Sequence, residues 1–213
     1  MDPAPRLVAL YERLYAAYGP QHWWPGTTPL EIMVGAVLTQ NTAWTNVERA
    51  INNLKAAGAL DFAALRALAR PALAGLIRPA GYYNLKAGRL GNLLDLLHGR
   101  FGDDWRTVFG LPLIEARDLL LRAKGVGPET ADAILLYAGG RPSFVIDAYT
   151  VRILHRHGLG QGLDYHGLRA LFMAGLPAEA ALYNEYHALL VRLGKEQCKK
   201  GQPRCEGCPA AGW

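Results

Sequence analysis

The sequence lacks the features that mark membrane, secreted and repetitive proteins. No apolar run approaches the roughly 18 residues that a bilayer-spanning helix needs, so we expect no membrane segment. The amino-terminal segment MDPAPRL has no apolar core of a secretory signal. The chain also contains no low-complexity tract and no internal repeat. These absences leave a soluble, cytoplasmic protein as the expectation.

Cysteine is also scarce, and its distribution is uneven. The chain has three cysteines, Cys198, Cys205 and Cys208, which all lie within its last sixteen residues. Because no secretory signal is present, this clustering favours a metal site over a disulfide framework.

Hydrophobic periodicity predicts helices along almost the whole chain. Apolar side chains recur at helical spacing, for example Leu7, Leu10 and Leu14 near the amino terminus. Glycine or proline interrupts this pattern at intervals of about ten to twenty residues. Val145-Ile146 is the one convincing β-like fragment, and it is too short to found a sheet. We therefore predict an all-α fold.

The segment 120–153 carries the strongest functional signal. It predicts a helix, a hairpin at Gly125 and Gly127, a second helix that begins with Pro128, and a later helix that starts at Asp147. The two glycines leave backbone N–H groups unobstructed by a Cβ, and the helix start adds the positive end of a dipole. Such a site binds a phosphate. The net charge of +5 also suits a polyanionic partner, although charge alone does not identify nucleic acid.

The hairpin and Asp147 together resemble the helix-hairpin-helix of the endonuclease III superfamily of DNA glycosylases, in which an aspartate follows at this spacing. The superfamily pattern has a lysine two residues after the hairpin glycines, and this chain has Glu129 there. A carboxylate cannot form the Schiff base with the sugar that a lyase requires. The resemblance therefore implies an enzyme that removes bases but has lost the lysine needed to cut the strand. Taken alone, Glu129 is also an ordinary residue for a first helical turn.

Asp147 has two interpretations. Aspartate is a common N-cap residue, worth about 1 kcal/mol to a helix. With the hairpin upstream, we favour a catalytic role in cleavage of an N-glycosidic bond. A carboxylate near the anomeric carbon stabilises the oxocarbenium-like charge and can orient a water molecule.

Other motifs resemble the 3-methyladenine DNA glycosylase branch of that superfamily, which also carries glutamate in place of the lysine. They are WWP at 23–25, GAVLTQNT at 35–42, RPAGYYNLKA at 78–87 and KGVGPETADAIL at 124–135. In that branch, aromatic residues at the positions of Trp24 and Trp44 sandwich the flipped base. A methylated purine is cationic, and indole faces attract cations. On composition alone, tryptophan pairs are more often core anchors.

The resemblance also implies contacts with the DNA around the flipped nucleotide. Gln40, followed by Asn41, would fill the gap that the nucleotide leaves, and Tyr82 would wedge into the base stack from the other side. Gly125 and Gly127 would bind a phosphate. Taken alone, Gln40, Asn41 and Tyr82 are ordinary loop residues.

The spacing Cys198-x6-Cys205-x2-Cys208 matches the [4Fe–4S] cluster of the superfamily, whose fourth cysteine would fall at position 214. Three or four thiolates also suit zinc, which remains the alternative. The fourth position is then a cysteine after Trp213, vacant, or filled by another ligand. Basic residues of the cluster loop would be held against phosphates, unless they form a solvated basic tail: Lys199, Lys200 and Arg204.

The histidines show no ligand spacing with these cysteines. We interpret four of them as surface or capping residues: His155, His157, His166 and His187.

The resemblance implies two helical domains with the active site in the cleft between them. A central six-helix domain with the helix-hairpin-helix would span 29–140. A second domain, which carries the cluster loop, would combine 1–28 and 141–213. Asp147 would then stand at the interface, where clefts usually form.

The prediction is a monomeric, monofunctional DNA glycosylase of base-excision repair. It would flip damaged bases, expected to be alkylated purines, out of double-stranded DNA and remove them hydrolytically, with AP-lyase activity weak or absent. One alternative is an endonuclease III-like glycosylase for oxidised pyrimidines. Another is a non-catalytic helix-hairpin-helix DNA-binding protein, which would have no need of a carboxylate beside the sugar. Nothing else in the chain resembles a sensor, which disfavours a metal-binding regulator.

Overall fold

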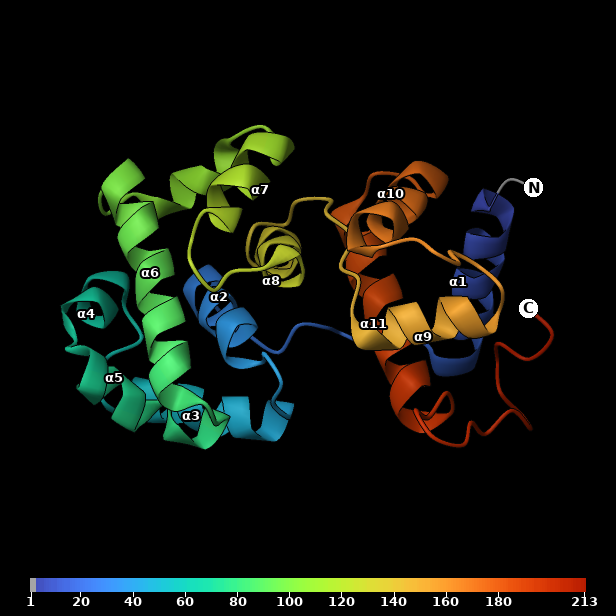
Figure 1. Cartoon of the computed structure of the whole chain (residues 1–213), viewed down its shortest axis with the longest axis horizontal. Helices are drawn as coiled ribbons and strands as arrows, with labels where there is room; N and C mark the ends of the chain where they lie inside the picture. The colour runs from blue at the N-terminus through green and yellow to red at the C-terminus, as the bar shows by residue number, and fades with distance from the viewer. Residues whose placement is uncertain (1–2) are drawn as a thin grey trace. The chain divides into compact units, whose positions relative to one another are not determined.

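The computed structural model describes residues 3–213, and these residues form helices and connecting segments without a β-strand (Figure 1). The prediction of an all-α fold is confirmed. The chain divides into two compact units. Unit 1 combines Met1–Trp24 with Gly140–Trp213, and unit 2 is Pro25–Gly139. The domain boundaries expected from the sequence were 29 and 140.

Over the part of the chain that is described, the longest helices are too short or too polar to cross a membrane. The cytoplasmic location stays a prediction.

Unit 2, whose residues are all described, contains seven α-helices, one more than the expected six. The break between α4 and α5 falls at Leu68 and Ala69, whose backbones are extended, and Pro71 then lies in the first turn of α5, where a missing N–H is tolerated. The elements of unit 2 are α2 (Pro29–Leu38), α3 (Trp44–Ala56), α4 (Phe62–Ala67), α5 (Arg70–Leu76), η1 (Arg78–Ala80), α6 (Tyr83–Phe101), η2 (Trp105–Gly110), α7 (Leu113–Leu121), α8 (Pro128–Ala133) and η3 (Ile134–Ala138).

Helix α2 forms the core of unit 2. It packs against α3, α6, α8 and η3, and Met33, Val34 and Val37 are fully buried (Figure 1). The helix begins at Thr28, whose Oγ1 accepts a hydrogen bond from the Glu31 N–H at 3.2 Å. Because α2 is capped at its start and buried along its length, it fixes the position of the loop that follows Leu38.

Unit 1 is built from four helices and an irregular carboxy-terminal segment, within the residues described. The helices are α1 (Ala4–Tyr18), α9 (Ala148–Arg156), α10 (Tyr165–Gly175) and α11 (Ala180–Glu196). Helix α1 packs on α10 and α11, and α9 packs on α11.

An aromatic cluster joins these elements. Phe144 stacks on Phe172 with ring centroids 3.9 Å apart, and both rings meet the edge of Tyr186. The Tyr186 hydroxyl donates a hydrogen bond to the Leu7 carbonyl at 2.7 Å, so α1 is tied to the same cluster. Val145 and Ile146 follow, and both are buried. The core therefore fixes the chain up to Asp147.

In unit 2 a buried ion pair joins the two helices that flank the hairpin. From α7, Arg117 donates from Nε to Asp132 Oδ1 at 2.9 Å and from Nη2 to Oδ2 at 3.0 Å. The Asp132 side chain, on α8, is fully buried, and that of Arg117 is 11% exposed. A bidentate pair of this kind fixes both distance and orientation.

Asp132→Asn should destabilise the protein by about 3 kcal/mol, because the change leaves the buried guanidinium without its counter-charge. Urea unfolding of the variant measures this loss. Asp118→Asn is the matched control, since Asp118 is exposed on the same pair of helices. Equal stability of Asp132→Asn and Asp118→Asn would contradict the structural role of the pair.

Candidate functional site

The hairpin between α7 and α8 depends on its glycines in two different ways. Gly125 has φ +100°, and a Cβ there would lie 2.2 Å from Cγ of Arg89. Gly127 is the N-cap of α8, and a Cβ there would meet nothing within 4 Å. The surface over Gly127 is therefore open, whereas Gly125 is packed against α6. From α6, Asn92 also donates to the Lys124 carbonyl at 2.9 Å.

Gln40 lies at this hairpin. Its Nε2 donates to the Gly125 carbonyl at 3.1 Å and to Thr130 Oγ1 at 2.9 Å. Its Oε1 accepts a short hydrogen bond from Arg89. The residue expected to enter DNA thus has its whole amide engaged within unit 2, and its role in filling a gap stays a prediction. No local pattern in the sequence marks Arg89, because its partners lie far away along the chain.

Asn41 and Tyr82 occupy the tips of two loops of unit 2. Both have left-handed backbones, with φ of +53° and +44°. Tyr82 is 70% exposed, and Asn41 is also exposed. Non-glycine residues are uncommon in this conformation, and they cluster where function requires a fixed geometry. Their contacts with DNA stay predictions.

Lys86, which the sequence did not single out, joins these two loops. Its Nζ is buried and donates to the carbonyls of Leu38 and Ala80 at 2.7 Å each. Thr42 Oγ1 donates to the same Ala80 carbonyl at 2.8 Å. Burial and the charge of Arg89 lower the pKa of Lys86. The loop after α2 and the turn before α6 are therefore tied to each other.

Asp147, in unit 1, is the N-cap of α9. Its Oδ1 accepts hydrogen bonds from the Thr150 N–H at 2.8 Å and from Thr150 Oγ1 at 2.9 Å. Its Oδ2 lies 3.8 Å from Nε2 of His187 on α11, and its side chain is 14% exposed. The N-cap interpretation is confirmed. The cap does not exclude a catalytic role for Asp147, because only one of its two carboxylate oxygens caps the helix.

The interpretation of His187 as a surface or capping residue is wrong. His187 is 5% exposed, and burial lowers its pKa, although the nearby Asp147 carboxylate opposes that shift. With its pKa lowered, the imidazole is neutral at pH 7. The helical spacing could have indicated this burial, since His187 lies one turn after Tyr183 on the buried face of α11.

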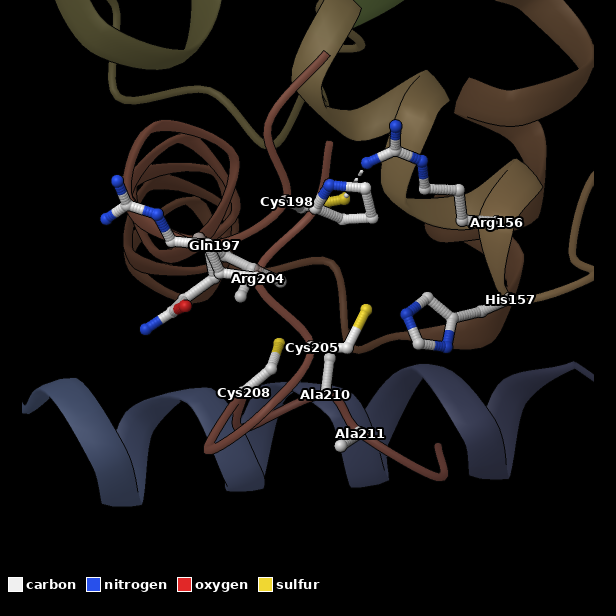
Figure 2. A pocket seen from close by; sticks show the side chains of 11 residues that line it. Arg156, His157, Gln197, Cys198, Arg204, Cys205, Cys208, Ala210 and Ala211 are labelled. Atoms are coloured by element: carbon white, nitrogen blue, oxygen red, sulfur yellow. Dashed lines mark hydrogen bonds between the residues drawn. The ribbon is translucent and has the colours of Figure 1, made fainter. Parts of the chain in front are cut away.

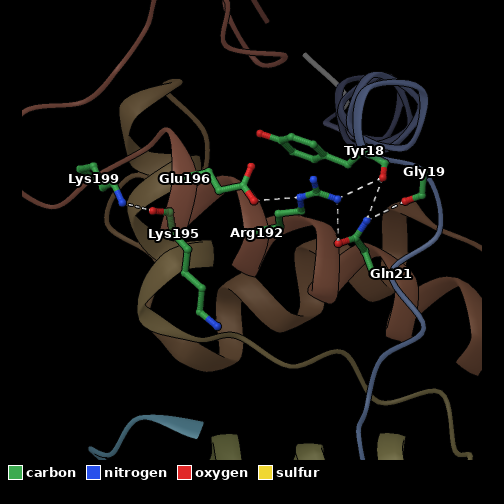
Figure 3. Close-up of polar contacts among 7 residues, drawn as sticks. All are labelled: Tyr18, Gly19, Gln21, Arg192, Lys195, Glu196 and Lys199. Carbon is green, nitrogen blue, oxygen red and sulfur yellow. Dashed lines mark hydrogen bonds and ion pairs between the residues drawn. The ribbon is translucent and has the colours of Figure 1, made fainter. Parts of the chain in front are cut away.

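The segment that leads to Trp24 is held by polar contacts at the end of α1 (Figure 3). Gln21 Nε2 donates to the Tyr18 and Gly19 carbonyls at 3.2 and 2.8 Å. From α11, Arg192 Nη1 also donates to the Tyr18 carbonyl, at 3.1 Å. The backbone N–H of Gln21 donates to Glu185 at 2.7 Å. Residues 18–21 therefore follow the surface of α11.

Trp24 is half-buried and meets the ring of Trp23 edge-on, with centroids 5.7 Å apart. The ammonium of Lys195 lies 5.7 Å from the Trp23 ring. Trp44 is the half-buried first residue of α3, and Glu129 is exposed in the first turn of α8. Trp24 belongs to unit 1 and Trp44 to unit 2, so the base sandwich stays a prediction.

The three cysteines of unit 1 border one cavity of about 130 Å³ (Figure 2). Burial raises the pKa of Cys208, and the charges of Cys198 and Cys205 raise it further, against backbone hydrogen bonds that lower it. Among residues 3–213, no three His, Cys, Asp or Glu side chains are gathered closely enough to bind one metal ion. In a [4Fe–4S] cluster each thiolate binds a different iron. The choice between a cluster and zinc stays a prediction.

Two arginines of α9 hold the loop that begins at Cys198. Arg152 Nε donates to the Cys198 carbonyl at 2.7 Å. Arg156 Nη1 donates to the Lys199 carbonyl at 2.7 Å and to Cys198 Sγ at 3.2 Å, and its Nη2 donates to the Lys200 carbonyl. The side chains of Lys199, Lys200 and Arg204 are exposed on this loop. Their contact with phosphates stays a prediction.

Comparison with known proteins adds to this geometry. The model of the HhH-GPD superfamily base excision DNA repair protein matches residues 34–177, which is more than half of the chain. The protein MJ1434 of Methanocaldococcus jannaschii, which carries the name of a proposed DNA repair glycosylase, is 44% identical over 205 residues. That alignment covers 95% of this chain and 93% of MJ1434. Endonuclease III of Thermotoga maritima is 27% identical, over 85% of this chain and 80% of its own.

Solved structures show the same architecture. The 3-methyladenine DNA glycosylase (MagIII) of H. pylori, bound to 1,N6-ethenoadenine, has a TM-score of 0.76 and 30% identity. The match covers 92% of this chain and 98% of that one. A non-covalent endonuclease III–DNA complex has a TM-score of 0.82 at 21% identity, over 98% and 94% of the two chains, which shows the shared fold alone. The chain belongs to the HhH-GPD superfamily of base excision DNA repair proteins.

Proposed function

We propose that the protein is a monofunctional DNA glycosylase that removes alkylated purines from double-stranded DNA by hydrolysis. The observation that carries the proposal is the environment of Asp147. One carboxylate oxygen is fixed by Thr150, and the other lies beside an imidazole that is neutral at pH 7. A charged carboxylate fixed in this way can stabilise an oxocarbenium-like sugar without reorganising. A pure DNA-binding protein would need this carboxylate only as the cap of α9.

In the proposed mechanism Asp147 acts near the anomeric carbon of the flipped nucleotide. As the bond to the base breaks, positive charge develops on the sugar, and the carboxylate stabilises it. The same carboxylate orients the water that adds to the sugar. His187 acts through Asp147, because its neutral imidazole lies 3.8 Å from Oδ2 and adds no positive charge beside the carboxylate.

Glu129 supports the monofunctional part of the proposal. A strand-cutting glycosylase needs an amine that forms a Schiff base with the sugar. At the position where the superfamily pattern has this lysine, the chain offers an exposed carboxylate in the first turn of α8. The expected product is an intact abasic site.

The choice of alkylated purines rests on Trp24 and Trp44. Both indoles are half-buried, so each keeps surface that a ligand can reach. A cationic methylpurine gains stacking from both rings and cation–π attraction as well. The match to the H. pylori enzyme, whose name gives 3-methyladenine, favours the same class of substrate.

The second candidate is removal of oxidised pyrimidines. Relatives named endonuclease III, such as that of Thermotoga maritima over 85% of this chain, favour it. Glu129 opposes the lyase step but not base release, so the two candidates differ in which bases are freed.

The DNA contacts belong to the same proposal. Open backbone at Gly127 binds a phosphate, and the exposed side chains of Asn41 and Tyr82 enter the helix beside the flipped nucleotide. Gln40 joins them once its contacts with the hairpin are released. The exposed basic side chains of the cysteine loop bind further phosphates of the duplex.

We also propose a [4Fe–4S] cluster held by Cys198, Cys205 and Cys208 in unit 1. When bound, such a cluster supplies structural support to its loop. The protein's own part is to present three thiols around one cavity and to hold the loop by Arg152 and Arg156.

Asp147→Asn should lower single-turnover release of 3-methyladenine by about two orders of magnitude or more, because the charge that stabilises the transition state is lost. Affinity for lesion DNA should stay within a few fold, since the asparagine oxygen can still cap α9.

Asp164→Asn is the matched control, because Asp164 caps α10 in the same way through the Gly167 N–H at 2.9 Å. It should leave base release unchanged. Near wild-type turnover by Asp147→Asn would remove Asp147 from the mechanism.

The enzyme should convert alkylated duplex into abasic sites that break only after alkali, and borohydride should trap no protein–DNA adduct. A gel of the strands before and after alkali measures the abasic sites. A gel of borohydride-treated reactions detects any protein–DNA adduct. Glu129→Gln should keep base release within a few fold, because Glu129 takes no part in the proposed hydrolysis. Efficient trapping by the wild type would show that another amine, with Lys124 the first to test, forms the Schiff base.

Alanine at Trp24 or at Trp44 should each cost about 1–3 kcal/mol of stacking with the flipped base. The loss in single-turnover rate should be larger for cationic 3-methyladenine than for neutral thymine glycol, since only the cation gains attraction to the indole face. Phenylalanine at either position should recover part of the activity. Equal losses on both lesions would argue against an alkylation-specific pocket.

A further inference from the structure

The side chain of Arg89, on α6, lies along the hairpin between α7 and α8. A Cβ at Gly125 would lie 2.2 Å from Cγ and 2.9 Å from Cδ of Arg89, so the aliphatic part of the arginine occupies the space beside this glycine. Gly125 itself is exposed. The Arg89 side chain therefore runs across a surface segment of unit 2, and it fits there because residue 125 has no Cβ.

The guanidinium at the end of this side chain has a neutral partner. Its Nη1 donates to Oε1 of Gln40, whose Nε2 donates to the Gly125 carbonyl at 3.1 Å and to Thr130 Oγ1 at 2.9 Å. Among residues 3–213, no carboxylate forms an ion pair with Arg89. A half-buried guanidinium of this kind keeps its whole positive charge available to an anion.

Lys86 adds a second positive group one turn earlier on α6. Its buried ammonium donates to the carbonyls of Leu38 and Ala80, which are neutral as well. Burial lowers the pKa of Lys86, and the charge of Arg89 lowers it further. The two cations therefore repel each other, and a negative charge beside Arg89 would relieve this repulsion.

The segments around Arg89 are those proposed to contact DNA. Gln40 and the exposed Asn41 follow the end of α2, and Gly125 belongs to the hairpin. The anion that a DNA duplex offers at such a surface is a backbone phosphate. Arginine suits this ligand, because its planar group of N–H donors matches the oxygens of a phosphate.

Gln40 cannot hold Arg89 and enter a duplex at the same time. When its amide leaves the hairpin, the Arg89 guanidinium loses the acceptor Oε1. A half-buried charged donor without an acceptor is unfavourable. A phosphate oxygen can replace Oε1, and it is the stronger acceptor because both partners are then charged.

We propose that Arg89 is a ligand of a DNA phosphate and that Gln40 covers it in the free protein. Entry of Gln40 into the duplex uncovers the guanidinium, which then exchanges an amide oxygen for a phosphate oxygen. The phosphate contact helps to offset the loss of the Gln40 hydrogen bonds. This inference rests on the proposed entry of Gln40 into DNA and is independent of which base is removed.

The first test is the salt dependence of binding to a duplex that carries a tetrahydrofuran abasic analogue, measured by fluorescence anisotropy. This duplex offers a gap for Gln40 and cannot be processed. Arg89→Met keeps an aliphatic stem beside Gly125 but removes the charge. It should reduce the steepness of log K against log salt by about 0.9, the value of one phosphate contact. The same term corresponds to about an eightfold loss of affinity at about 0.1 M salt.

Arg100→Met is the matched control, because Arg100 is exposed in the last turn of the same helix. It should leave the salt dependence unchanged. A purely structural role of Arg89 would weaken binding without changing its salt dependence, so an unchanged slope for Arg89→Met would overturn the proposal. Equal reductions for Arg89→Met and Arg100→Met would overturn it too, since they would reflect net charge alone.

The second test uses an undamaged duplex, which has no gap for Gln40. Wild type should then keep Arg89 covered, whereas Gln40→Ala exposes it before DNA arrives. Gln40→Ala should therefore bind this duplex more tightly than wild type, with a salt dependence steeper by about 0.9. Adding Arg89→Met should abolish both gains. Identical binding by Gln40→Ala and wild type would show that Gln40 does not cover Arg89.

The possible failures are distinguishable. Thermal melts followed by circular dichroism check that the variants fold, and if Arg89→Met does not, Gln40→Ala still tests the proposal against wild type. If wild type releases bases but Arg89→Met keeps its salt dependence, the phosphate assignment is wrong and the glycosylase proposal stands. If the salt dependences change as expected but no base is released, Arg89 keeps its role and the glycosylase proposal falls.

Discussion

The stack of Phe144 on Phe172 is the contact on which unit 1 depends. It lies where α1, α10 and α11 meet, and Tyr186 links it by a hydrogen bond to the carbonyl of Leu7. Val145 and Ile146, which follow Phe144, are buried, and Asp147 comes next as the N-cap of α9. The Asp147 carboxylate is therefore held in place by the core of unit 1. This is how an ordinary capping residue becomes suited to electrostatic catalysis, which requires charge fixed before the reaction.

In unit 2, side-chain hydrogen bonds hold the loops in place. The hairpin is held by Gln40, Arg89 and Asn92, which reach it from the end of α2 and from α6. Lys86 joins the loop after α2 to the turn before α6. The segments proposed to contact DNA are therefore connected to each other by hydrogen bonds from side chains. The proposed movement of Gln40 into a duplex would release its three hydrogen bonds to Gly125, Thr130 and Arg89.

What the sequence could predict was local. Helical periodicity, the glycines of the hairpin, the cap formed by Asp147 and the spacing of the cysteines each involve a few neighbouring residues. All of these were visible without coordinates. The helical spacing on α11 also indicates that His187 is buried, so its interpretation as a surface or capping residue overlooked a local signal.

What the sequence could not predict involves partners far apart along the chain. Arg89 lies 49 residues from Gln40, Lys86 lies 48 residues from Leu38, and His157 lies 56 residues from Trp213. No local pattern marks such pairs, because only the packing of helices brings them together. Val145 and Ile146 show the same limit, since both are buried although the described residues form no strand beside them.

The most direct test of the central claim is a base-release panel on the wild-type protein. Duplexes that carry alkylated purines, oxidised pyrimidines or uracil are incubated with the enzyme, and the freed bases are identified by mass spectrometry. The account predicts release of methylated purines, 3-methyladenine foremost, with the strand left intact. Release of oxidised pyrimidines alone, or binding to every duplex with no base released, would contradict it.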